Sequence, residues 1–416
     1  MKTDQIQKVH KDWYKLDLSA IVYPTLQRRD FSSVYRLSVL LKEDIDPEIL
    51  QRAVNLTMPR FPTYKAAIRK GVFWRYLEPN DRPGPFVQED VKNPCQPMHF
   101  KGNNRYLVRI YYYRNRIALE AHHSLGDGTG GMCVLQTLTA TYLRLKGHSE
   151  IENGGFVLDI LGIPDPGELE DAYMKYANAK VCPPRPGEKT YRVRGTKEPF
   201  YTLNIIDGIM SVSEVMRVAK SYNATITEYL NSVLLYALMQ KQESEWHLKL
   251  RPVKIAMPVN LRRFFPSRTL RNFITMIYPG IDPRLGEYTF EEIVTQVHNY
   301  MRYYLNEKLL RGDITTNAET QRNPFIRIVP LFIKDLVVRQ FYTKIQDKNS
   351  SAGLTNMGAL KVPETMKPYI ERFDIYMGQP FSTRTNCAIA SFEDILTINF
   401  ASSCLLYTSP SPRDLS

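Results

Sequence analysis

The chain has 416 residues, of which 43% are hydrophobic and 24% charged, a composition typical of folded globular proteins and not of disordered or fibrous ones. Lys and Arg number 55 against 43 Asp and Glu, and the net charge of +12 favours anionic partners: nucleic acid, acidic lipid, a phosphate-bearing cofactor or an acidic carrier protein. Nucleic acid is the weaker option, because the sequence holds no long Lys/Arg run and no zinc-finger or RNA-binding pattern.

Hydropathy and cysteine usage indicate the compartment. No window approaches the roughly 18 uninterrupted apolar residues of a spanning helix, so we expect no transmembrane segment. The start of the chain leads into polar residues and not into the apolar core of a signal peptide. The five cysteines are scattered without a CxxC spacing, which argues against a zinc knuckle or a dithiol redox site. An odd number of cysteines without a signal peptide fits a reducing environment, so we expect a cytoplasmic protein.

Strand and helix patterns alternate through the first half of the chain. A helix is expected to begin at Asp46-Pro47, with Asp46 as N-cap and Pro47 in the first turn, and to stop at Pro59. A second helix is expected from about residue 130 to Gly147. Strands are expected at 35–41, 65–69, 72–77, 105–113 and 116–121, the last two forming a hairpin.

The second half repeats this alternation after a change in composition. Residues 166–195 are rich in proline, glycine and charge, and we interpret them as a crossover linker with a short helix near 168–179. A long helix is predicted from the capping box of Thr289 and Glu292. Strands are expected at 199–206, 253–259, 273–278, 388–392 and 395–400, and helices at 213–222 and 227–240.

These elements predict a mixed α/β (α+β) architecture. Because single hydrophobic cores stop growing beyond roughly 250–300 residues, we expect two lobes, at 1–165 and 196–404, on either side of the linker. Residues 405–416 break the preceding strand pattern abruptly and resemble a translated sequencing-adapter scar. We therefore expect a non-native tail there, the alternative being a genuine flexible terminus.

The residues that carry chemistry lie between His122 and Gly131, where a strand ends and a helix starts. Glycines at 126, 128, 130 and 131 are expected to let the backbone adopt positive φ and approach a ligand closely. The free amides at the helix start would stabilise negative charge forming beside the turn. A histidine here can act as a general base, because its ordinary pKa of about 6.5 leaves neutral imidazole available near neutral pH. Asp127 could orient the ring directly, or it could fix the turn by pairing with an arginine.

His122, His123, Asp127 and Gly128 form the pattern His-His-x-x-x-Asp-Gly. In this spacing the segment resembles the signature of the superfamily of chloramphenicol acetyltransferase-like and condensation-domain acyltransferases. Two further segments are similar to motifs of that superfamily: 257–263, where an asparagine replaces the usual aspartate, and 354–358. The N-terminal stretch from 13–17 to 71–74 is most similar to bacterial alcohol acetyltransferase-like proteins. The plant BAHD branch is excluded, because the sequence has no Asp-Phe-Gly-Trp-Gly segment.

The resemblance implies two acetyltransferase-like lobes that form a V-shaped pseudo-dimer with a central tunnel. It implies that His123 is the catalytic base, that His122 supports the turn, and that Gly128 offers a backbone amide and room for substrate. A metal site is not expected, although His122, His123 and Asp127 are all ligand types, because adjacent histidines on an extended strand end point to opposite faces.

The resemblance also assigns the other site residues. The motif aspartate is mainly structural in the superfamily, which implies an ion pair between Asp127 and Arg262, with Arg263 as the alternative partner. The strand at 354–358 would line the opposite side of the tunnel and place Thr355 or Asn356 near the developing oxyanion. The candidate substrate- and oxyanion-binding residues on this strand are Thr355, Asn356 and Gly358.

The expected reaction is transfer of an acyl group, acetyl in the simplest case, from a coenzyme A thioester to a small alcohol. A ternary complex is expected, because the motif supplies a base and no activated nucleophile; Ser124 lacks the context of a triad serine. No permanently bound cofactor is expected, with acyl-CoA or a phosphopantetheinyl carrier as cosubstrate, and we expect a monomer. The alternatives are a free-standing condensation domain that forms amides or esters from carrier-bound acyl groups, and a non-catalytic carrier-binding relative.

Overall fold

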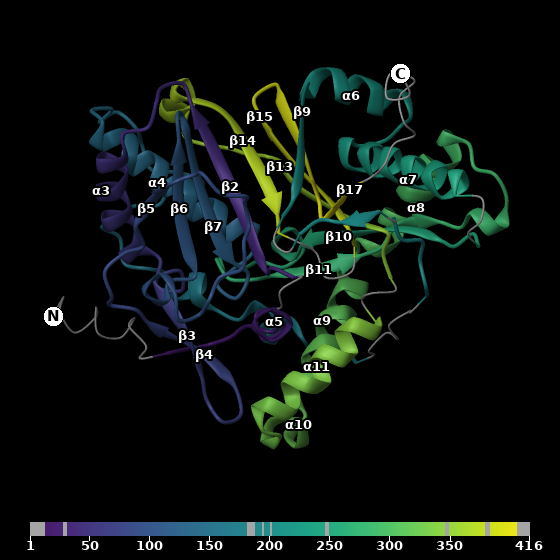
Figure 1. Ribbon diagram of the computed structural model, residues 1–416, viewed down its shortest axis with the longest axis horizontal. Coiled ribbons are helices and arrows are strands. Elements are labelled where there is room, and N and C mark those ends of the chain that lie inside the picture. The colour runs from purple at the N-terminus through teal and green to yellow at the C-terminus, as the bar shows by residue number, and fades with distance from the viewer. Residues whose placement is uncertain are drawn as a thin grey trace.

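The computed structural model describes residues 13–27, 31–180, 188–193, 195–199, 202–245, 249–345, 349–378 and 383–405. Two larger sheets, one of five strands and one of seven, are accompanied by helices in a mixed α/β architecture (Figure 1). This fold class confirms the prediction from the sequence. The predicted tail at 405–416 lies outside the described residues apart from its first residue.

The five-stranded sheet has the order β14-β2-β7-β6-β5. Its strands are β2 (Val34–Leu41), β5 (Val87–Glu89), β6 (Val108–Tyr113), β7 (Arg116–His122) and β14 (Ile370–Met377). Every residue of β2 is buried, as expected for a strand with both faces covered. The antiparallel register of β2 and β7 pairs Val34 with His122, so β7 ends at the histidine motif.

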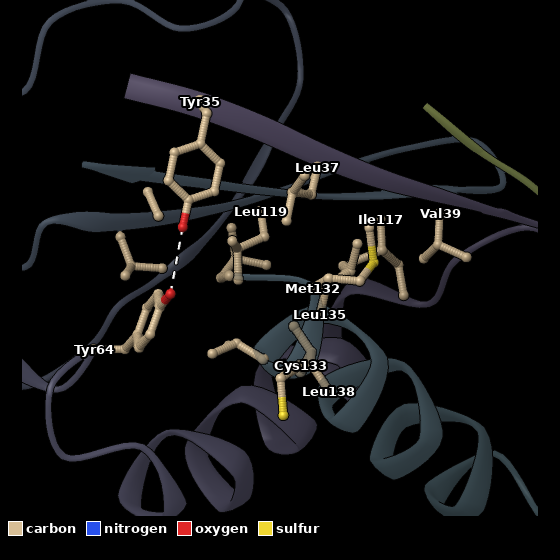
Figure 2. Close-up of a cluster of buried hydrophobic side chains, with 14 of the residues drawn as sticks. Tyr35, Leu37, Val39, Tyr64, Ile117, Leu119, Met132, Cys133, Leu135 and Leu138 are labelled. Carbon is tan, nitrogen blue, oxygen red and sulfur yellow. Dashed lines mark hydrogen bonds between the residues drawn. The ribbon is translucent and has the colours of Figure 1, made fainter. Parts of the chain in front are cut away.

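Two helices pack on one face of this sheet, α3 (Pro47–Thr57) and α4 (Gly128–Leu145). The predicted cap of α3 is confirmed, because the Asp46 carboxylate accepts hydrogen bonds from the backbone amides of Glu48 and Ile49. Helix α4 is buried over most of its length and runs through the core. In Figure 2 its residues Met132, Leu135 and Leu138 lie opposite the strand residues of the sheet, and the hydroxyls of Tyr35 and Tyr64 are 3.4 Å apart.

Strand β14 joins the two large sheets. It pairs with β2 in the sheet of N-terminal strands, although 370–377 falls within the predicted C-terminal lobe. Its other contacts reach the seven-stranded sheet: the Thr397 hydroxyl donates to the Phe373 carbonyl at 2.8 Å, and the Phe373 and Phe392 rings meet edge-on at 5.5 Å. The predicted lobe boundaries and the V shape stay predictions.

The seven-stranded sheet has the order β11-β10-β13-β15-β16-β9, with β12 pairing β10. Its strands are β9 (Asn204–Ser211), β10 (Val253–Asn260), β11 (Ile274–Ile277), β12 (Gly280–Ile281), β13 (Ala352–Ala359), β15 (Thr385–Phe392) and β16 (Ile395–Ser402). Helices α6 (Val212–Ser221), α7 (Ile226–Ser244) and α8 (Phe290–Tyr304) accompany it. The predicted capping box at Thr289 and Glu292 is present, whereas β9 starts later than the predicted strand at 199–206.

The remaining elements are short or lie at the periphery. A small sheet holds β1 (Tyr14–Lys15), β3 (Ala66–Lys70) and β4 (Arg75–Pro79), and β8 (Thr196–Lys197) pairs β17 (Cys404–Leu405). The other helices are α2 (Tyr23–Leu26), α5 (Ala172–Tyr176), α9 (Glu307–Arg322), α10 (Pro324–Ile328) and α11 (Leu331–Ile345). Short 3-10 helices lie at Met58–Arg60, Asn103–Arg105, Pro166–Leu169, Leu261–Arg263, Pro283–Leu285 and Glu364–Tyr369. Among the described residues, none of the helices combines the length and apolar character needed to cross a bilayer.

Candidate active site

The histidine motif is a tight connection between β7 and α4. The His122 amide donates to the Leu107 carbonyl at 3.0 Å, and the His123 amide donates to the Ser33 carbonyl at 2.8 Å. The Leu125 amide closes the turn on the His122 carbonyl at 3.0 Å. These backbone hydrogen bonds fix the main chain at His122 and His123, from which the two imidazole side chains extend.

His122 is enclosed in the core and has no exposed surface. Its Nδ1 accepts a hydrogen bond from the Ser124 amide at 3.2 Å, and its ring meets the Phe100 ring edge-on at 5.4 Å. Burial, together with the neighbouring His123, lowers the pKa of His122 to about 3. The ring is therefore neutral at neutral pH and is enclosed within the turn, and its supporting role stays a prediction.

His123 is partly buried and lies between two tyrosine rings. Its ring stacks on Tyr23 with centroids 4.8 Å apart, and it lies 4.6 Å from the tilted ring of Tyr35. Burial lowers the pKa of His123 to about 4, with the Asp127 charge and Asn272 acting weakly in the opposite direction. Its Nδ1 makes no hydrogen bond with any residue that the structure describes. The result is a neutral, oriented imidazole, the form that a general base requires.

Asp127 is committed to structural contacts. Its Oδ1 accepts from the amides of Thr129 and Gly130 and thereby caps α4, and its Oδ2 accepts from the Phe273 amide at 2.9 Å. Arg262 donates to both oxygens, from Nη1 at 2.8 Å and from Nη2 at 3.3 Å. The carboxylate thus accepts five hydrogen bonds, and none of those in the described part of the chain comes from the His123 ring.

Arg262 connects the end of β10 to the start of α4. Besides Asp127, its guanidinium donates from Nε to the Thr269 carbonyl at 2.9 Å. Asn260 accepts from Arg262 at Oδ1 and donates from Nδ2 to the Thr129 hydroxyl at 3.1 Å. Asn260 therefore bonds to Arg262 as an acceptor and to Thr129 as a donor. Arg263, the alternative partner, is exposed on the surface.

The predicted reason for the glycines is wrong. None of Gly126, Gly128, Gly130 and Gly131 has a positive φ. They are required because other groups pack directly against their Cα atoms: a Cβ at Gly130 would collide with the carbonyl oxygen of Leu270, and one at Gly131 would lie 2.6 Å from the Tyr35 hydroxyl. The turn is therefore close-packed rather than conformationally unusual.

Strand β13 brings the second predicted segment to the same place. The Met357 sulfur lies against Gly128, 3.0 Å from where a Cβ would stand. Asn356 faces elsewhere, since its Nδ2 donates to the Thr227 hydroxyl at 2.9 Å and its Oδ1 accepts from the Gly358 amide at 2.7 Å. Gly358 has φ +73, so here glycine is needed for its left-handed backbone. Because adjacent side chains alternate along a strand, Thr355 is expected on the face of β13 opposite to Asn356, and its place beside the motif stays a prediction.

One supporting residue was missed by sequence reasoning. Asn272, between β10 and β11, donates from Nδ2 to the His123 carbonyl at 2.9 Å and also to the carboxylate of Asp17, 3.1 Å from Oδ2. Asp17 is fully buried and lies 3.7 Å from the Nε of Arg271. This network fixes the backbone of His123 from the far side of the turn. No local sequence pattern predicts the contact of Asn272 with His123, because the two residues are 149 positions apart in the chain.

The surface has two hollows, and no residue of the histidine turn lines either of them. One is a groove of about 620 Å³ along α8, and the other is a polar pocket of about 250 Å³ over the five-stranded sheet, reached by Arg36, Lys92 and Arg109. His123 lines neither of them, so the predicted tunnel at His123 stays a prediction. Across the described residues, no three His, Cys, Asp or Glu side chains gather closely enough to hold a metal ion.

Comparison with known proteins places the fold. No protein-family model matches the chain, and no curated protein sequence matches it. Among solved structures, the trichothecene 15-O-acetyltransferase TRI3 from Fusarium sporotrichioides is similar with a TM-score of 0.59 and 14% identity, over 95% of this chain and 91% of that one. The starter condensation domain of rhizomide synthetase RzmA, in complex with C8-CoA, is similar with a TM-score of 0.60 and 12% identity, over 97% of this chain and 92% of that one.

A third similar structure is a domain named for a different reaction. The epimerization domain from the third module of tyrocidine synthetase B has a TM-score of 0.58 and 11% identity, over 96% of this chain and 93% of that one. The chain therefore has the condensation-domain and acetyltransferase fold that the motif resemblance predicted. Because acetyltransferase, condensation and epimerization domains share this fold, the reaction has to be argued from the site.

Proposed function

We propose that the protein is an acyltransferase that transfers an acyl group from a coenzyme A thioester to an alcohol, with His123 as general base. The observation that carries the proposal is the His123 imidazole: neutral, oriented between Tyr23 and Tyr35, and with an Nδ1 free of hydrogen bonds to the described residues. The adjacent His122 also has a ring nitrogen, Nε2, without a partner among the described residues, but this side chain has no exposed surface.

The proposed reaction needs only this base and an oxyanion donor. The imidazole takes the proton of the acceptor hydroxyl as its oxygen attacks the thioester carbonyl. The tetrahedral intermediate then collapses, the carbon–sulfur bond breaks, and the leaving thiolate takes the proton from the imidazolium. The products are the ester and the free thiol. Because burial keeps the pKa of His123 at about 4, its protonated form returns the proton readily.

Thr355 is the better candidate for the oxyanion donor. Asn356, the other candidate, uses its side-chain amide on Thr227 and Gly358, whereas strand alternation would direct Thr355 to the opposite face of β13. A well-placed oxyanion donor contributes roughly 3–4 kcal/mol to transition-state stabilisation. Substituting Thr355 by valine keeps the side-chain shape and removes the hydroxyl, so it separates this role from a packing role.

The second candidate is condensation of carrier-bound acyl groups. The RzmA neighbour is a condensation domain, and the net charge of +12 suits an acidic carrier protein as well as the phosphates of coenzyme A. An amine acceptor, or a requirement for a carrier-bound donor, would favour this candidate. Carrier binding without turnover would favour a non-catalytic relative.

The test is a thiol-release assay with acetyl-CoA and octanoyl-CoA over a panel of alcohols and amines. We expect ester formation, and we expect His123→Ala to lower it by roughly 10²- to 10⁴-fold while the thermal unfolding midpoint stays close to that of the parent. The matched control is His99→Ala, at an exposed histidine, which should leave turnover unchanged. Undiminished turnover in His123→Ala would remove the catalytic assignment.

A further inference from the structure

Large apolar side chains are exposed at one end of the molecule. They lie on α10, on α11 and at the tip of the β3–β4 hairpin, which project together at the lower end of Figure 1. The most exposed of them, with their exposed fractions, are Phe325 (78%), Phe332 (73%), Val72 (71%), Ile328 (69%), Val337 (60%) and Leu336 (59%). We call this surface the apolar tip.

Hydrogen bonds hold the parts of the apolar tip together. The Leu331 amide donates to the Val72 carbonyl at 2.8 Å, which attaches the start of α11 to the hairpin. The Lys334 ammonium donates to the carbonyl oxygens of Phe73 and Arg327, at 2.9 and 3.1 Å. The two segments, far apart in sequence, therefore form one built surface.

Helix α11 turns several apolar side chains outward and an acidic side chain inward. Its Asp335 faces the protein and forms an ion pair with Arg75 at 2.6 Å and a hydrogen bond with Thr25 at 2.9 Å. Phe332, Leu336 and Val337 face outward, where a surface helix ordinarily carries polar residues. An apolar patch of this kind on a folded protein marks an interaction surface.

The charge around the apolar tip is positive. Residues 322–345 include five Lys or Arg and a single acidic residue, Asp335, whose charge is used internally by Arg75. Arg327, between the apolar side chains of α10, is exposed, and so is Lys70 at the hairpin. A partner that binds this surface should therefore offer apolar groups to the apolar side chains and negative charge to the basic residues around them.

We propose that the apolar tip docks the protein on an anionic lipid membrane, with its apolar side chains at the boundary of headgroups and acyl chains and its basic residues on the lipid phosphates. A projecting surface that mixes aromatic, aliphatic and basic side chains fits a bilayer interface. The attachment is peripheral, because no helix in the described ranges can span a bilayer. The inference goes beyond the proposed acyl transfer and does not depend on it.

The test is co-sedimentation of the full chain with vesicles of phosphatidylcholine alone and of equimolar phosphatidylglycerol and phosphatidylcholine. We expect binding to the anionic vesicles that weakens as salt is raised. The double variant Phe325→Ser/Phe332→Ser and the charge reversal Arg327→Glu should each weaken it by about tenfold or more.

Matched control variants test whether vesicle binding depends on the apolar tip or on any exposed leucine or arginine. Leu161→Ser/Leu285→Ser removes two leucines that are 88% and 79% exposed elsewhere, and Arg52→Glu reverses an exposed charge on α3; neither should change binding. The tip variants should also release thiol from dissolved substrates at the parent rate, which keeps this test independent of the acyl-transfer proposal. Absence of binding to anionic vesicles, or equal loss in the control variants, would overturn the proposal. So would a dimer that the tip variants convert to monomer, because the surface would then be an interface between copies.

Discussion

The histidine turn and the apolar tip treat polar groups in opposite ways. In the turn, polar side chains are buried: the Asp127 carboxylate accepts five hydrogen bonds, whereas His122 Nε2, His123 Nδ1 and the Ser124 hydroxyl have no hydrogen-bond partner among the described residues. In the tip, the polar side chain of Asp335 is again turned inward, but apolar side chains take the solvent face. A candidate catalytic site is thus recognised by buried polar atoms without hydrogen-bond partners, and a candidate docking surface by apolar side chains that remain exposed.

The largest expected effect concerns the ion pair of the turn. Asp127→Asn removes the charge opposite Arg262, whose side chain is only 11% exposed, and should destabilise the fold by roughly 3–5 kcal/mol. Chemical denaturation measures this, with Asp44→Asn at an exposed aspartate as the matched control. A loss in Asp127→Asn no larger than in the control would show that the turn does not depend on this pair.

The next effect tests the close packing of the turn. Gly130→Ala inserts a methyl group against the carbonyl of Leu270 and should cost about 1–3 kcal/mol or more. Gly102→Ala is the matched control, because the nearest atom to its Cβ is the His99 carbonyl oxygen at an ordinary 3.4 Å. If the two substitutions proved equally mild, the four glycines would need a different explanation.

A pH titration sharpens the account of His123. The pKa of His123 is about 4 in the folded protein, below its value in the unfolded chain. Between pH 6.5 and 4 the unfolded chain therefore binds more protons, and His123 lowers the free energy of unfolding of the protein as the pH falls. His123→Ala lacks this penalty, and its stability relative to the parent should rise by up to about 1.4 kcal/mol per pH unit in that window. Comparing the two proteins cancels the opposite contribution of Asp171, whose pKa burial raises to about 6.

Enzyme kinetics gives the same titration a second readout. The acid limb of kcat/KM should lie near pH 4 and not near the ordinary histidine value, because the base stays neutral down to its lowered pKa. An acid limb at about pH 6.5 would mean that the imidazole is solvated like a surface histidine.

The smallest effect is expected at the apolar tip. Phe332→Ser should change the free energy of unfolding by no more than about 0.5 kcal/mol, because the side chain is already 73% exposed. Leu135→Ser, in the core beneath β2, is the contrasting substitution and should be strongly destabilising. A large loss at Phe332 would mean that its ring is covered in solution by another part of the protein.

Local sequence patterns predicted much of the fold. The caps at Asp46 and Thr289 and the strand at 253–259 follow from interactions within a few residues, so short windows contain the information. The helices at 307–345 escaped prediction. In α11 the outer face mixes apolar side chains with Arg339 and Gln340, so its pattern is not that of an ordinary surface helix. The site was predictable only through motif spacing, which indicated His122, His123 and Asp127 and the placement of Arg262.

By itself, then, the sequence determined most of the elements before residue 307, the histidine turn and the superfamily resemblance, because each is encoded in contiguous residues. Only the tertiary structure decided that β14 crosses into the N-terminal sheet, that Asn272 and Asp17 support His123, and that Gly130 is needed for space and not for backbone conformation. These features depend on contacts between residues more than a hundred positions apart. Chain proximity carries no information about such contacts, which form only when buried polar groups and close-packed side chains are satisfied together.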